Sequence, residues 1–130
     1  MPKAMVVDDS RTIRRILGGI LAQLGFEVAE AENGLAALAT LDRERAAGTP
    51  VSLTLVDWNM PEMNGLEFVK RLRADGRNGA VTAVMVTTET QVDQMVAALE
   101  AGANEYVMKP FTKDIIMDKL DMLGVAPEVV

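Results

Sequence analysis

The chain has 130 residues, of which 49% are hydrophobic and 25% are charged, a composition typical of one globular domain and not of a disordered chain. Its 19 acidic and 13 basic residues give a net charge of −6, which argues against a protein that binds nucleic acid on its own. Cysteine and histidine are both absent, which excludes disulfides, thiol nucleophiles, Ser-His or Cys-His triads, and metals held by thiolate or imidazole.

Short apolar runs alternate five times along the chain with segments of helical periodicity. The runs predict strands over residues 5–7, 26–31, 53–57, 81–86 and 106–108. The periodic segments predict helices over 13–24, about 35–46, 65–72, 92–101 and 113–123. Gly25 and Gly102 are placed to end the first and fourth helices, and Thr112 to begin the fifth.

Strands separated by helices of this length indicate right-handed crossovers and a parallel sheet. The first, third and fourth strands are nearly continuous apolar runs, as expected for strands covered on both faces, whereas the second and fifth are mixed and suit sheet edges. The sequence therefore predicts an α/β fold, a (βα)5 flavodoxin-like doubly wound sheet with strand order 2-1-3-4-5. Such folds bind their ligand where the order reverses, here between the first and third strands.

The apolar stretch 4–7 is too short for an export signal or a membrane span and leads directly into two aspartates. We therefore expect a cytoplasmic protein without membrane insertion. We also expect a single domain over residues 1–130, with a core at about 4–124, a short tail at 125–130 and no output domain. A monomer is expected.

Polar residues stand at the carboxyl ends of the predicted strands: Asp8 and Asp9 after the first, Asp57 at the end of the third, Thr87 after the fourth and Lys109 after the fifth. Because these ends share one edge of a parallel sheet, the side chains should meet. Helix capping would explain one acid in the stretch 8–10, but not two acids facing a third. Crowded carboxylates need a cation to offset their repulsion, and oxygen ligands favour Mg²⁺.

Each of these residues has an ordinary interpretation when taken alone. Asp57 could merely end a strand, Lys109 could be a solvated surface lysine, and Thr87 could be a β-branched strand residue. Placed together, Asp57 can act as a nucleophile toward phosphorus, Lys109 can pair with a phosphoryl oxygen, and the Thr87 hydroxyl can donate to a bound phosphoryl group. This combination predicts a phosphorylation switch.

Several short stretches of the chain match the motifs of a known family. They are Val-Val-Asp-Asp-Ser (6–10), Val-Asp-Trp-Asn-Met-Pro (56–61), Gly65, Val-Thr (86–87) and the run over 100–111. From Met5 to about Leu123 the chain resembles the receiver domain of two-component response regulators. Within that family, residues 57–61 are most similar to the single-domain chemotaxis regulators.

The resemblance implies that Asp57 accepts a phosphoryl group from a sensor histidine kinase. It also implies that Asp8, Asp9, Asp57 and the backbone carbonyl of Asn59 hold Mg²⁺, while Lys109 contacts the phosphoryl group.

For the response to phosphorylation, the resemblance implies that Thr87 moves toward the phosphate and Tyr106 changes rotamer. The face formed by the fourth helix, fifth strand and fifth helix would then bind a flagellar switch protein or another downstream protein. Asn59 and Glu89 would tune hydrolysis of the acyl phosphate, and a cis bond would precede Pro110. The chain departs from the family pattern at Thr88, where alanine is usual, and at Asn64, where aspartate is common.

Three other functions fit parts of the pattern. A stand-alone receiver in a different phosphorelay, governing differentiation or stress, would use the same site. A phosphatase using an aspartyl phosphate would need a second acid to protonate the leaving group, but position 59 is Asn. A nucleotide binder would need an anion cradle after the first strand, where this chain has carboxylates. We therefore expect no enzyme beyond self-phosphorylation from a donor and auto-dephosphorylation.

Overall fold

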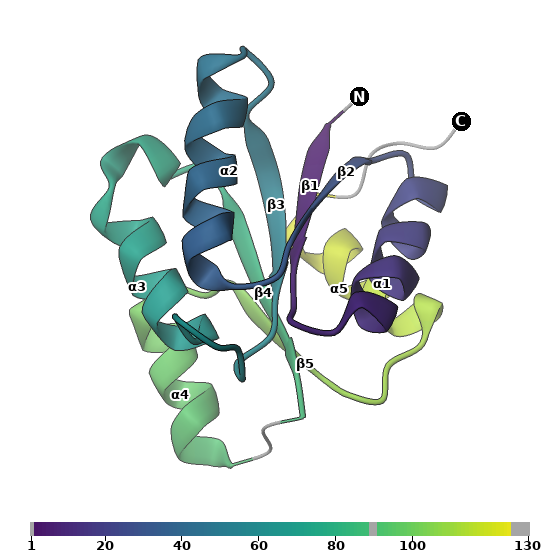
Figure 1. Ribbon diagram of the computed structural model, residues 1–130. Coiled ribbons are helices and arrows are strands. Elements are labelled where there is room, and N and C mark those ends of the chain that lie inside the picture. The colour runs from purple at the N-terminus through teal and green to yellow at the C-terminus, as the bar shows by residue number, and fades with distance from the viewer. Residues whose placement is uncertain (1, 89–90, 126–130) are drawn as a thin grey trace.

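The computed structural model describes residues 2–88 and 91–125 and shows one parallel sheet between two layers of helices (Figure 1). The sheet runs in the order β2-β1-β3-β4-β5, as predicted. The strands are β1 (Lys3–Val7), β2 (Glu27–Ala31), β3 (Val51–Val56), β4 (Thr82–Thr87) and β5 (Glu105–Met108). The helices are α1 (Arg11–Gln23), α2 (Gly34–Ala46), α3 (Gly65–Ala74), α4 (Val92–Ala101) and α5 (Lys113–Leu123), with a 3₁₀ turn, η1, at Gly76–Asn78.

The two faces of the sheet build two separate cores. Helices α1 and α5 cover one face, and α2, α3 and α4 cover the other (Figure 1). Strand β1 alternates between them: Ala4 and Val6 face the first core, while Met5 and Val7 face the second. All four are fully buried, because a central strand of a doubly wound sheet has no solvent-facing side.

Short polar side chains fix where the helices begin at the carboxyl edge of the sheet. The Ser10 hydroxyl accepts a hydrogen bond from the amide of Ile13, and the Asn64 side chain accepts one from Glu67. Thr112 caps α5 in the same way, as predicted. Gly102, with φ of 117°, ends α4 in the left-handed conformation, also as predicted. None of the helices in the described ranges is both long and apolar enough to cross a bilayer.

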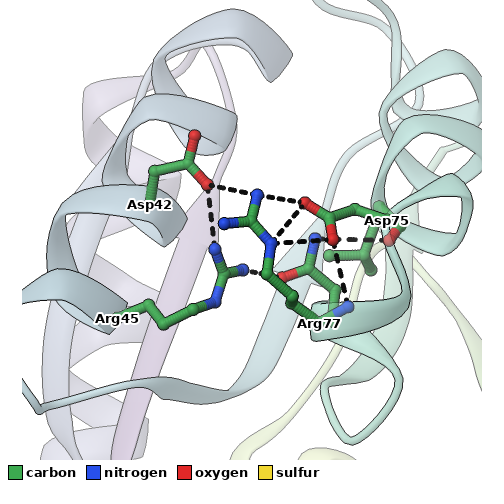
Figure 2. Close-up of polar contacts among 6 residues, drawn as sticks. Asp42, Arg45, Asp75 and Arg77 are labelled. Carbon is green, nitrogen blue, oxygen red and sulfur yellow. Dashed lines mark hydrogen bonds and ion pairs between the residues drawn. The ribbon is translucent and has the colours of Figure 1, made fainter.

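The opposite, amino edge is tied together by charged side chains from α2 and from the turn after α3 (Figure 2). Arg45 pairs with Asp42 at 3.0 Å and donates to the side-chain oxygen of buried Asn78. Arg77 pairs with Asp75 at 2.7 Å, and this contact lowers the pKa of Asp75 to about 2. The network links α2 to η1 at the end of the molecule away from the predicted site.

Gly65 sets the start of α3 against the strand end that carries Asp57. Its amide donates to the carbonyl of Trp58 at 2.8 Å. A Cβ at this position would overlap the backbone oxygen of Asp57 and would lie 2.9 Å from the Met85 methyl. Glycine is required here because two backbone segments approach closely.

We expect Gly65→Ala to lower the free energy of unfolding by roughly 1–3 kcal/mol, the usual cost of overpacking. Gly19→Ala is the matched control: it lies inside α1, and an added Cβ meets nothing within 4 Å. That variant should raise stability by about 0.5–1 kcal/mol, because alanine is favoured over glycine inside a helix. Urea unfolding of the three proteins compares them; a Gly65→Ala protein as stable as the parent would contradict the packing argument.

Candidate functional site

Three aspartates meet at the carboxyl edge of the sheet, as the sequence predicts. One carboxylate oxygen from each of Asp8, Asp9 and Asp57 lies within 4.8 Å of the others. The neighbouring strands bring them together: Val7 pairs with Val56, and the amide of Asp57 donates to the Val7 carbonyl at 2.9 Å. Asp8 and Asp57 are buried, at 1% and 8% exposed, while Asp9 is exposed.

Lys109 brings a positive charge into this cluster from the end of β5. Its ammonium nitrogen lies 3.0 Å from Oδ2 of Asp8 and 3.5 Å from Oδ2 of Asp57. Its backbone amide donates to the carbonyl of Thr87, which fixes the strand end from which the side chain departs. The Lys109-Pro110 bond is cis, as the family resemblance implied. The alternative interpretation of Lys109, as an ordinary solvated surface lysine, is therefore wrong.

The electrostatic environment works against ionisation of Asp57. Burial is the main cause that raises the pKa of this carboxyl, and the charge of Asp8 adds to it. Three groups lower the pKa of Asp57: the Lys109 ammonium, the Thr87 hydroxyl, which donates to the carboxylate, and the Trp58 amide. Their combined effect is smaller than that of burial and Asp8, so the pKa remains raised. A buried carboxylate in this position gains from any further positive charge placed beside it.

The donor set fits a hard divalent cation. Asp8, Asp9 and Asp57 offer carboxylate oxygens, and Asp9 faces an open pocket of about 580 Å³. The pocket is lined by Asp9, Trp58, Asn59, Met60, Pro61 and Asn64. Such a site leaves room for water, which small hard cations retain as ligands. Asn59 is exposed and lines this pocket together with Asp9.

The two residues expected to switch lie deeper. Thr87 ends β4 and is fully buried, and Tyr106 is 6% exposed in the core beneath α2, α3 and α4. On the adjacent strands, Met85 pairs with Tyr106 and Thr87 with Met108. Tyr106 also borders a groove of about 410 Å³ over β5 and α5. Tyr106 therefore belongs to this core and also contributes to the wall of the groove. Glu89, expected to act with Asn59, lies outside the described residues.

One residue at the site was missed by the sequence analysis. Arg14, in α1, donates to the backbone carbonyl of Asp8 and pairs with Glu30 on β2. The helical pattern placed residue 14 on the polar side of α1, but gave no means of knowing that this side faces the loop after β1. The contact depends on where α1 begins, two residues before the first apolar position of the pattern.

Comparison with known proteins agrees with this geometry. The response regulator receiver domain family matches residues 4–121. Chemotaxis protein CheY1 of Helicobacter pylori (strain J99) is 45% identical over 122 residues, which cover 93% of this chain and 95% of that protein. The chemotaxis protein CheY homolog of Campylobacter jejuni is 45% identical over 124 residues, covering 94% and 92%.

Solved structures give the same result. Chemotaxis protein CheY4 of Vibrio cholerae superposes with a TM-score of 0.84 at 33% identity, covering 94% of this chain and 98% of that one. Receiver domains are signalling domains and not catalysts of a substrate reaction. With its fold, its acidic cluster and its similarity over most of the sequence, the chain belongs to the response regulator receiver domain family.

Proposed function

We propose that this protein is a chemotaxis response regulator that accepts a phosphoryl group on Asp57 from a sensor histidine kinase. The observation that carries the proposal is the position of the Asp57 carboxylate between two other acids and the Lys109 ammonium, 3.5 Å away. A role in chemotaxis is supported by two relatives named as chemotaxis proteins, each 45% identical over more than 90% of the chain. The same support favours chemotaxis over a phosphorelay that governs differentiation or stress.

In the proposed reaction, a carboxylate oxygen of Asp57 attacks the phosphorus of a phosphohistidine on the kinase. An O–P bond forms while the P–N bond breaks, and the electron pair stays on the imidazole, which takes up a proton. Lys109 places its charge against a phosphoryl oxygen. Asp8, Asp9, Asp57 and the carbonyl of Asn59 would hold Mg²⁺, which when bound offsets the negative charge of the carboxylates and phosphoryl oxygens.

The phosphoryl group would act on the distant face through Thr87 and Tyr106. The Thr87 hydroxyl donates to Asp57 in the unmodified protein, and a phosphoryl oxygen would become its new acceptor. Movement of Thr87 opens space beside Tyr106 on the adjacent strand, and the ring changes rotamer. Shifting such a switch from 1:99 to 99:1 requires about 5.5 kcal/mol of differential stabilisation.

The face over α4, β5 and α5 is suited to a protein partner. Exposed apolar patches on soluble proteins often mark interaction sites, and this face carries five large exposed apolar side chains: Val92, Val96, Leu99, Met108 and Ile115. We propose that a flagellar switch protein binds here. A cytoplasmic monomer that acts as a single receiver domain is consistent with this role. The net charge of −6 disfavours binding to nucleic acid, whose phosphates are also negative.

Incubation with acetyl phosphate and Mg²⁺ should add one phosphoryl group to the protein and none to Asp57→Asn. The reason is that the amide is not a nucleophile for this transfer. Asp93→Asn, which removes an exposed acid on α4, is the matched control and should be modified like the parent. Intact-mass spectrometry gives the measurement, and hydroxylamine sensitivity identifies an acyl phosphate. A modified Asp57→Asn protein, or turnover of many phosphoesters, would reject the proposal.

The stability of the metal-free protein should depend on the charge of Asp57. Because its pKa is raised above 3.8, the folded state binds this proton more tightly than the unfolded state does. The stabilising contribution is therefore full below pH 3.8 and is lost as the pH rises through the folded-state pKa. At about pH 7.5, Asp57→Asn should raise the free energy of unfolding by on the order of 1 kcal/mol, and this gain should shrink toward acid pH.

Magnesium should make the parent more stable than the Asp57→Asn variant, the opposite of the ranking expected without metal. At about 100 times its dissociation constant, Mg²⁺ should stabilise the parent by about 2.7 kcal/mol and the Asp57→Asn variant by much less, because the variant lacks a charged ligand. Urea unfolding across pH, with chelator and with Mg²⁺, supplies the measurement. Equal stabilisation of both proteins by Mg²⁺ would place the cation elsewhere.

A further inference from the structure

Arg14 joins the loop after β1 to strand β2. Its Nη1 donates to the backbone carbonyl of Asp8 at 2.7 Å, and its Nε lies 3.1 Å from Oε1 of Glu30. The arginine side chain is only 15% exposed. A planar guanidinium is suited to this task, because it can direct two donors at two fixed acceptors at once.

The carbonyl that Arg14 contacts lies where the regular sheet bonding ends. Strand β1 finishes at Val7, whose carbonyl accepts from the amide of Asp57. The amide of Asp8 still donates to the carbonyl of Ala31, on the β2 side. The Asp8 carbonyl oxygen is the next acceptor along the chain, and because Asp8 itself is buried this oxygen needs a donor from the protein. Arg14 supplies that donor at a distance typical of charge-assisted hydrogen bonds.

This contact also bears on Asp9. The carbonyl of Asp8 and the amide of Asp9 belong to one planar peptide group, so holding the carbonyl fixes the direction in which the Asp9 main chain continues. Within residues 2–88 and 91–125, the Asp9 carboxylate forms no hydrogen bond or ion pair. The orientation of the exposed Asp9 carboxylate therefore depends on the conformation of its main chain.

We infer that Arg14, held by Glu30, is a positioning residue that orients the Asp8–Asp9 peptide and so raises the affinity of the three aspartates for Mg²⁺. The inference rests on the proposed function, in which these aspartates hold the ion. Arg14 touches no proposed ligand oxygen; its contact is with the main chain behind them.

Charge and geometry make opposite predictions for the loss of Arg14. If only its positive charge mattered, removal would reduce repulsion of a divalent cation and tighten Mg²⁺ binding. If its geometry matters, removal frees the Asp8–Asp9 peptide and weakens binding. Arg14→Lys separates the two effects further, since it keeps the charge but lacks the fork that reaches both acceptors.

The test is a Mg²⁺ titration at constant ionic strength, followed by the fluorescence of Trp58 and, independently, by calorimetry. Trp58 is the only tryptophan and adjoins Asp57. Arg14→Lys and Arg14→Gln should each weaken binding roughly tenfold, the lower end of the usual cost of losing a partner that orients a metal ligand. Arg15→Gln, which removes the same charge from an exposed neighbouring position on α1, should bind Mg²⁺ as tightly as the parent or slightly more tightly.

Glu30→Gln provides a second variant should the Arg14 variants fail to fold, as judged by circular dichroism. It leaves the arginine in place but weakens its anchor, so it should reduce Mg²⁺ affinity roughly two- to threefold. The double variant Arg14→Gln/Glu30→Gln should bind no more weakly than Arg14→Gln, because the two residues act as one unit.

Parent-like affinity in Arg14→Lys, or tighter binding in Arg14→Gln, would overturn the inference while leaving the magnesium site intact. If the Arg14 variants do not fold, parent-like affinity in Glu30→Gln overturns it. Absence of Mg²⁺ binding in the parent itself would instead reject the proposed metal site. The two failures are therefore distinguishable in one experiment.

Discussion

The arrangement of this molecule depends on the repulsion among three carboxylates that the sheet forces together. Asp8, Asp9 and Asp57 follow the ends of adjacent parallel strands, whose register pairs Val7 with Val56 and so brings the three carboxylates close together. The pKa of Asp57 is raised chiefly by burial of its carboxyl, and repulsion from the charge of Asp8 adds to this effect. Because strand pairing holds these carboxylates close together, the cluster favours a neighbouring positive charge, as the contacts of Lys109 with Asp8 and Asp57 show.

Because both faces of the sheet are packed against helices, a side-chain movement at the carboxyl edge of the sheet affects neighbouring residues. Helices cover both faces of the sheet, and Thr87 at the end of β4 is fully buried, so movement of this side chain changes the space available to its neighbours. Tyr106, on the adjacent strand, borders a groove over β5 and α5. The exposed apolar side chains of Met108 and Ile115 line the same groove, so the proposed switch would connect a gain of charge at Asp57 to this surface.

Much of this architecture could be predicted from the sequence, because it follows from burial. The contrast between the apolar run 81–86 and the mixed run 26–31 separates central from edge strands, and the strand order then brings Asp57 to Asp8. The resemblance to receiver domains added the cis bond before Pro110. Periodicity could not reveal η1, which depends on the side chain of Asp75 accepting from the amide of Arg77. Nor could it reveal Arg14, whose partners are a main-chain carbonyl and a residue on another strand.

The charged network at the amino edge has a further consequence for the behaviour of the protein in salt. Arg77 and Asp42 are about two-thirds exposed, so dissolved ions screen their attraction readily, whereas the pair formed by Lys109 and Asp8 is shielded from solvent. High ionic strength thus weakens the attraction between Arg77 and Asp42 before it affects the acidic cluster, while the hydrogen bond from Arg45 to buried Asn78 still joins α2 to η1.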